Sequence, residues 1–209
     1  MTYDRSDADR DEMYERLSDE LYPQHRDQAV VEFTSERLRS FYVANPLVMR
    51  PAMEAIQEGR HLLRNGHWSA ALVFFVTAIE GLLKATLLKP VVHGLVHSEG
   101  LANVVVEQAL GQAGFDRYTG LLAKLFSELV DMDIRSVKIA GSAQKLLEEC
   151  TALQRERNAI VHQGTSSSKE RAEHALRVAS AVLDLIVHPM LLHLDLYEVE
   201  NGEIRRIGS

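Results

Sequence analysis

The sequence predicts an all-α protein: a helical bundle with an N-terminal helical extension and a short C-terminal tail that resembles a β-hairpin. Apolar residues recur at helical spacing through most of the 209 residues. Glycine (12) and proline (5) are scarce, which argues against a loop-rich all-β fold. We divide the chain into the extension (1–45), the bundle (46–195) and the tail (196–209).

The extension contains two predicted helices. The first, residues 6–21, is charged and weakly amphipathic, and Pro23 ends it. The second, residues 26–43, is more apolar and ends before Asn45-Pro46.

The bundle begins with a predicted helix over residues 47–65, which Asn65-Gly66 stops. The next helix, Trp68 to Leu88, is apolar on nearly all sides, as expected of a central, buried helix. We expect Lys89-Pro90 to end it.

Residues 91–100 are irregular in pattern, and residues 101–111 and 119–131 are predicted as helices. A longer helix covers 142–162, with Gly164 at a typical C-cap position just beyond it. Three serines (166–168) offer caps for a last helix over 169–188 or more, in which Pro189 is a kink or a stop.

The tail carries Asn201-Gly202, the strongest short hairpin signal. This turn predicts that Val199 pairs with Ile204 and Glu198 with Arg205. A lone hairpin is marginally stable in water, so it must dock on the bundle or on a partner.

The net charge of −7 is unevenly distributed. Residues 1–20 hold eight acidic and three basic side chains, whereas residues 135–177 hold eight basic and five acidic ones. The chain is therefore not a generally basic nucleic-acid coat protein. The basic segment suits a phosphate chain, and a solvated helix surface is the alternative.

A cytoplasmic location is expected. Cys150 is the only cysteine, so neither an internal disulfide nor a cysteine zinc site can form. The acidic N-terminus does not resemble a secretion signal. The longest apolar run, Trp68 to Ile79, is too short for a bilayer, which needs about 20 apolar residues, and we expect no membrane partner.

Several common chemical signatures are missing from the sequence. It has neither a phosphate-binding glycine loop nor a Gly-x-Ser-x-Gly elbow. Cys150 lies on an apolar helix face, where a core role is commoner than a nucleophilic one. His93 and His97 have a metal-ligand spacing, but Gly94 lies between them and no Glu follows His93. We therefore predict no metal and no cofactor.

The most informative segment is Arg157-Asn158-x-x-x-His162. On a helix, Asn158 and His162 share a face, and His162 lies in the last turn, where the helix dipole favours a protonated imidazole. A base, an amide and a permanent cation at one helix end suit phosphodiester cleavage without a metal. The alternative is a surface arginine and a histidine that only complements the dipole.

Glu80 lies inside the most apolar helix of the chain. A carboxylate buried there needs a cation or a donor, because an unpaired buried charge is costly. Arg157 is the partner that would join this helix to the motif helix. The alternative is Lys84, one turn further on.

This combination resembles the HEPN superfamily (higher eukaryotes and prokaryotes nucleotide-binding) over roughly residues 46–190. Arg157, Asn158 and His162 match the Arg-Asn-x-x-x-His form of its motif. The helix that carries Glu80 resembles the helix that holds an acidic residue in many members.

The resemblance implies a HEPN-type bundle and a metal-independent endoribonuclease, either a toxin or an effector of antiviral defence. It implies a homodimer that cleaves RNA in a composite cleft, and an antitoxin or regulatory protein as a partner. His162 would then be the general acid or base, Arg157 would stabilise the phosphate, Asn158 would orient either of them, and Glu80 would hold Arg157.

The chain also departs from the family. In the branch paired with a nucleotidyltransferase antitoxin, a tyrosine follows two residues after the histidine, whereas here this residue is Gly164. Adenylylation at this position is therefore excluded. Two other hypotheses stay open: a non-catalytic dimeric module that binds a nucleotide or a protein, and an acidic arm (1–22) that covers the basic cleft.

Overall fold

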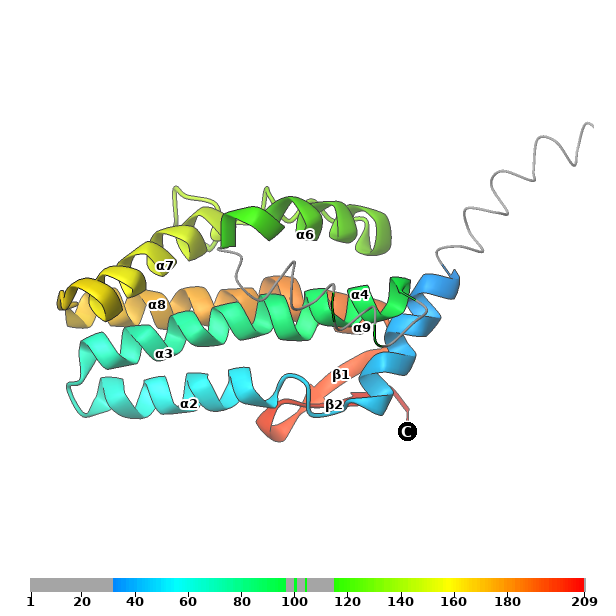
Figure 1. Ribbon diagram of the computed structural model, residues 1–209, viewed down its shortest axis with the longest axis horizontal. Helices are drawn as coiled ribbons and strands as arrows, with labels where there is room; N and C mark the ends of the chain where they lie inside the picture. The colour runs from blue at the N-terminus through cyan, green and yellow to red at the C-terminus, as the bar shows by residue number, and fades with distance from the viewer. Residues whose placement is uncertain (1–31, 97–99, 101–103, 105–114, 209) are drawn as a thin grey trace, which may run out of the picture.

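The computed structural model describes residues 32–96, 100, 104 and 115–208 (Figure 1). It is mostly helical, with one small antiparallel strand pair at the C-terminal end, which confirms the predicted class and the strand pair. The predicted helices 6–21 and 101–111 lie outside the described residues, apart from residue 104.

The bundle is built around α3 (Trp68–Gly81), against which α2 (Arg50–Arg64), α7 (Leu146–Gln163) and α8 (Lys169–Val182) pack. Figure 1 shows α2, α3 and α8 running along the long axis of the molecule and α7 lying obliquely to them. Leu72, Phe75 and Ile79 of α3 are fully buried. Their burial confirms α3 as the central helix, as its apolar sequence predicts.

The helix of α3 does not end at Lys89-Pro90, so this prediction is wrong. It continues through a π-helical turn (Leu82–Leu88) into α4 (Lys89–Leu95). Pro90 lacks an N–H, so it cannot donate to the carbonyl of Thr86, four residues earlier. The buried Tyr42 hydroxyl, from helical residues 32–44, donates to that carbonyl instead, which satisfies the acceptor released by the proline.

Pro189 is accommodated in the same way. The helix that begins with α8 passes through a second π-helical turn (Leu183–Val187) and ends as α9 (His188–His193). The proline therefore does not stop this helix. In both helices a wider turn lies immediately before the proline, where an α-helical turn would clash with the ring.

The ends of α7 and α8 follow their capping residues. Gly164 ends α7 with a φ of 68°, in the left-handed region, and the Oγ of Ser168 accepts from the Arg171 N–H at 3.3 Å, as predicted. The start of α7 is later than predicted, at Leu146, because Ser142 turns its hydroxyl toward Glu149 instead of joining the helix. The preceding helix α6 spans Phe115–Val130.

The tail forms a hairpin, but in a different register from the predicted one. Strands β1 (Leu196–Val199) and β2 (Glu203–Arg206) pair Glu198 with Ile204 and Val199 with Glu203, across a three-residue turn. This register puts Leu196 and Ile204 on one face, and both are buried. The predicted register would put them on opposite faces, so burial on the bundle selects the longer turn.

Two long helices, Trp68–His93 and Lys169–His193, have the length and composition of membrane spans, which corrects the expectation that every apolar segment is too short. Both are core helices of the bundle, and 61% and 50% of their most apolar windows are buried within it. Burial in a core demands the same composition as a lipid environment, so these helices are weak evidence for a membrane.

Candidate functional site

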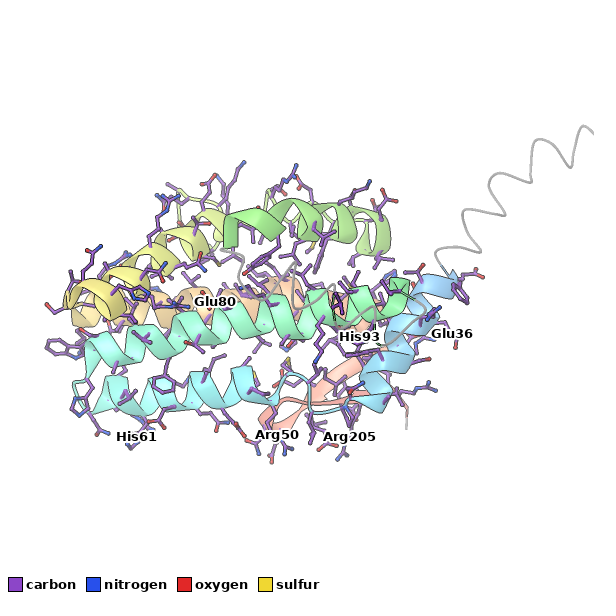
Figure 2. The ribbon with its side chains drawn as sticks, viewed as in Figure 1. Glu36, Arg50, His61, Glu80, His93 and Arg205 are labelled. Atoms are coloured by element: carbon purple, nitrogen blue, oxygen red, sulfur yellow. The ribbon has the colours of Figure 1, made fainter. Side chains whose placement is uncertain are left out.

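The site is built on an ion pair between α3 and α7. Nη2 of Arg157 donates to both carboxylate oxygens of Glu80, at 2.8 and 2.7 Å. The predicted pairing of these residues is therefore present. The side chains are 22% and 19% exposed, so the pair is only partly buried and one edge of it reaches solvent. Figure 2 shows Glu80 on α3, at the side facing α7.

The other guanidinium nitrogens of Arg157 have different surroundings. Nη1 donates to Oδ1 of Asn158 at 3.0 Å. Nε is buried and has no hydrogen-bond partner among the residues that the structure describes. One terminal nitrogen of the guanidinium is thus bound to Glu80, and the other is bound to Asn158. Asn158 itself is exposed.

Gln154 completes this cluster, and sequence reasoning missed it. Its Nε2 donates to Oε1 of Glu80 at 2.7 Å, so one carboxylate accepts from two residues of α7. Residues 154 and 157 are three apart and share a helix face. This spacing could have identified Gln154 from the sequence. If Arg157 reaches Glu80, a polar residue three or four positions away on the same helix face can reach it too.

Tyr118 is buried close enough to Glu80 to be affected by its charge, and it contacts Lys84. Burial raises the pKa of the Tyr118 hydroxyl, and the negative charge of Glu80 raises it further. Nζ of Lys84 lies 5.3 Å from the centroid of the Tyr118 ring, a cation–π contact. The phenol is therefore kept neutral beside the carboxylate.

His162 occupies the last turn of α7, as predicted, and is exposed. Its ring makes no hydrogen bond or ion pair with any residue that the structure describes. An exposed imidazole in this setting is accessible to a substrate. The same helix therefore presents a held cation, an amide and an open base, and one such set is present in each chain.

Two polar networks, centred on Glu149 and Glu156, connect the part of α7 that precedes the motif to α8. Glu156 accepts from Nε and Nη2 of Arg171, at 3.0 and 2.6 Å, and from the Ser167 hydroxyl at 2.8 Å. In the first turn of α7, buried Glu149 accepts from Ser142 and pairs with His174, both at 2.7 Å. The motif helix is thus held against its neighbour.

The hydrogen bonds of these two networks lower the pKa values of their carboxyl groups. Burial raises the pKa of Glu149, but hydrogen bonds from Ser142 and His174 outweigh it, and the net pKa lies below the ordinary value. The pKa of Glu156 is lowered too, because its bonds from Arg171 and Ser167 outweigh burial. Both carboxylates therefore favour the charged form at neutral pH.

Cys150 is buried in the core, as predicted, and burial raises the pKa of its thiol. No group of three or more histidine, cysteine or acidic residues that could hold a metal ion occurs in the described part of the chain. Of the His93 and His97 pair, His97 lies outside that part.

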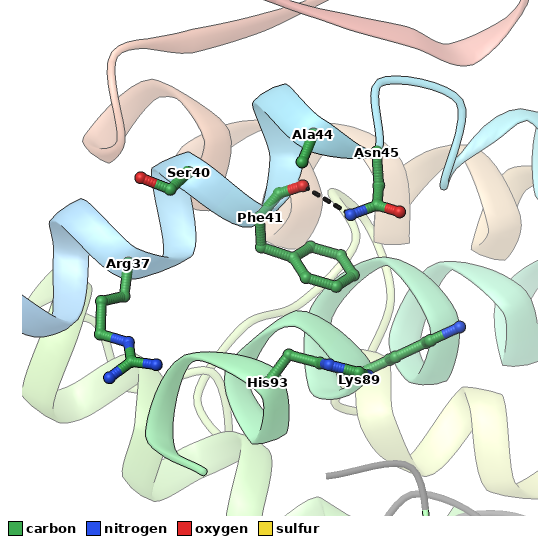
Figure 3. A pocket seen from close by; sticks show the side chains of 7 residues that line it. All are labelled: Arg37, Ser40, Phe41, Ala44, Asn45, Lys89 and His93. Atoms are coloured by element: carbon green, nitrogen blue, oxygen red, sulfur yellow. Dashed lines mark hydrogen bonds between the residues drawn. The ribbon is translucent and has the colours of Figure 1, made fainter. Parts of the chain in front are cut away.

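Two surface hollows lie at opposite ends of the bundle. One, of about 460 Å³, lies where α7 ends and α3 begins, and Trp68, Ser69, Ser166 and Ser167 are among its lining residues. The other, of about 450 Å³, lies between residues 32–44 and α4. Figure 3 shows Arg37, Lys89 and His93 around that second hollow, with the Phe41 ring against His93. Sequence reasoning identified neither hollow, because each joins residues distant along the chain.

Comparison with models of protein families, with curated proteins and with solved structures finds no match to this chain, so the function is argued from the geometry of the site.

Proposed function

We propose that the protein is a metal-independent endoribonuclease of the HEPN type, acting as a homodimer in the cytoplasm as a toxin or an effector of antiviral defence. The observation that supports this most is the clamp on Arg157. Glu80 holds its guanidinium while Asn158 contacts it, on the same helix that presents the exposed His162. A merely solvated arginine would not need a carboxylate from another helix.

The chemistry that we propose is transfer within the substrate. The ribose 2′-hydroxyl attacks the adjacent phosphorus, and its proton passes to a neutral imidazole of His162. The P–O bond to the 5′-oxygen breaks, and that oxygen receives a proton from a second, protonated imidazole. The products are a 2′,3′-cyclic phosphate and a 5′-hydroxyl. Arg157 stabilises the charge on the non-bridging oxygens.

A dimer follows from this proton count. Each chain supplies one motif histidine, whereas the reaction uses a base and an acid. A two-fold axis beside α7 would bring a second His162 to the same phosphate. Val161, next to His162, is 53% exposed and gives the motif helix an apolar contact for such an interface.

The test is cleavage of mixed RNA by purified protein in EDTA, with analysis of the product ends. His162→Ala is expected to abolish cleavage. His193→Ala is the matched control, because His193 is also an exposed histidine in the last turn of a helix. Cleavage that needs a divalent metal, or that persists in His162→Ala, would refute the proposal.

A second candidate function is a non-catalytic module that binds a nucleotide. The hollow in Figure 3 favours it, since Arg37 and Lys89 supply positive charge near the rings of Phe41 and His93. Calorimetric titration with a nucleoside monophosphate distinguishes the two candidates. Binding that Lys89→Ala abolishes, in a protein that cleaves no RNA, would favour the module.

A further inference from the structure

The hollow beside Trp68 has the features of a site for one flat, polar-edged ring. Trp68, the only tryptophan of the chain, is 41% exposed at its wall. The other lining side chains include His67, Ser69, Ser166 and Ser167, which offer an imidazole and hydroxyls, and the lining contains no acidic residue. An aromatic face next to short polar groups suits a nucleobase better than an aliphatic chain.

The hollow is preformed. The Ser167 N–H donates to Oγ of Ser69 at 2.8 Å, which joins the segment after α7 to the first turn of α3. The hydroxyl of Ser167 donates to Glu156, which Arg171 also holds. The two walls are therefore fixed relative to each other, and a ligand would not have to order them.

The hollow also lies close to the motif. Only three residues separate His162 from Ser166, so the connecting chain spans at most about 14 Å. Arg64, at the exposed end of α2, adds positive charge at this end of the bundle, where the acidic Glu156 is already paired with Arg171. An RNA strand with its phosphate at His162 would have a neighbouring base within reach of Trp68.

We infer that Trp68 is the stacking platform for an unpaired nucleobase of a single-stranded RNA, beside the phosphodiester that His162 would act on. This inference rests on the proposed function for the identity of the strand. Stacking of a base on an aromatic side chain tolerates different bases, so Trp68 would contribute affinity and position rather than strict sequence choice.

Intrinsic tryptophan fluorescence tests the inference directly, because Trp68 is the only source. The probe is an uncleavable 2′-O-methyl hexa-adenylate, and an abasic oligonucleotide of equal length and charge is its control. We expect saturable quenching by the hexa-adenylate and none by the abasic strand. If the anisotropy of a labelled hexa-adenylate shows that it binds, but tryptophan fluorescence is not quenched, the inference is overturned.

Variants separate stacking from a structural role. Trp68→Ala is expected to weaken binding about tenfold, whereas Trp68→Phe keeps most of the affinity. The matched control is Phe33→Ala, an exposed aromatic outside the hollow, which should leave affinity unchanged. Equal RNA affinities for Trp68→Ala and the parent protein would contradict the inference. A Trp68→Ala protein that loses only its ability to self-associate, with RNA affinity unchanged, would contradict it too.

The outcomes also distinguish this inference from the proposed function. Quenching by RNA in a protein that never cleaves would support the base site and refute the nuclease. Cleavage with an unchanged KM in Trp68→Ala would support the nuclease and refute the base site.

Discussion

At the scale of the residue, Arg157 organises the site, because it contacts Glu80 on α3 and its own helix neighbour Asn158. The carboxylate fixes the guanidinium, and the ion pair as a whole has no net charge. A phosphate would therefore meet an oriented donor group more than a free cation. Gln154, which shares Glu80, prevents the carboxylate from turning away.

Glu80→Ala is expected to destabilise the protein by about 2–3 kcal/mol, less than for a fully buried pair because one edge of the pair reaches solvent. The change removes the acceptor of Arg157 and Gln154. Urea unfolding measures the effect, and Glu58→Ala, at an exposed helix position, is the control. If the urea midpoints of Glu80→Ala and Glu58→Ala are equal, the ion pair does not contribute to stability.

Arg157→Ala is expected to melt about 4–8 °C below His162→Ala, because only the first variant leaves Glu80 without its cation. Both should lack cleavage under the proposed function, and Arg157→Ala should also lose RNA affinity, since its charge acts on bound substrate as well. Scanning calorimetry and filter binding measure the two effects. Equal melting temperatures would contradict the anchoring role of Arg157.

At the scale of the element, α7 buries four apolar residues of its first half in the core and is also joined to α8 by polar contacts. Its ion pairs to α8 are made by Glu149 and Glu156, both of which precede the motif. These polar contacts involve carboxylates with lowered pKa values, so they weaken in acid, whereas the apolar packing of α7 does not depend on pH.

Glu149 should contribute to acid unfolding. Its folded pKa is below the ordinary value of about 4.3, so its stabilising effect is present above that value and is lost as pH falls toward the folded pKa. In Glu149→Gln, stability should be lower at pH 7 and should fall less steeply below about pH 5. Urea unfolding at a series of pH values checks this. Parallel curves for the two proteins would contradict it.

Replacement of Gly202, in the hairpin turn, should destabilise the protein more than replacement of Gly141. Its φ is +74°, and an added Cβ would lie 2.7 Å from Cγ of Met53 and 3.1 Å from the backbone of Arg50. Gly202→Ala is expected to cost about 2–4 kcal/mol, through strain and displacement of the hairpin. Gly141→Ala, with a φ of +80° and open space around it, should cost only about 1 kcal/mol. Thermal unfolding of both variants compares them, and equal losses would exclude the steric contribution.

At the scale of the whole molecule, the bundle presents the motif at one end and docks the hairpin toward the other (Figure 1). The structure describes a single chain, and the proposed reaction needs two motifs. Self-association through the motif helix is therefore the property on which activity would depend.

Val161→Asp is expected to shift a dimer to monomer and to abolish cleavage, because it puts a charge into the proposed apolar contact beside His162. Leu192→Asp is the matched control, since Leu192 is also highly exposed but lies on α9. Sedimentation velocity at micromolar concentration reports the oligomeric state. A parent protein that sediments only as a monomer would contradict the dimer.

Local pattern was enough to determine the helical class, the central position of α3, the C-cap at Gly164 and the core position of Cys150. Each depends on residues within one or two turns, or on the rule that an apolar helix is buried. The pairing of Glu80 with Arg157 could also be predicted, because a carboxylate in such a helix needs a cation and the motif helix offers one.

Only the tertiary structure decided that two helices continue past Pro90 and Pro189. It also decided the register of the hairpin, the role of Gln154 and the hollow at Trp68. Each is settled by groups far apart in the chain. Tyr42 satisfies the carbonyl that Pro90 releases, Leu196 and Ile204 must share a buried face, and Ser167 meets Ser69 across two helix ends. Local propensity carries no information about such partners, because burial and hydrogen bonding act between whichever residues the fold brings together.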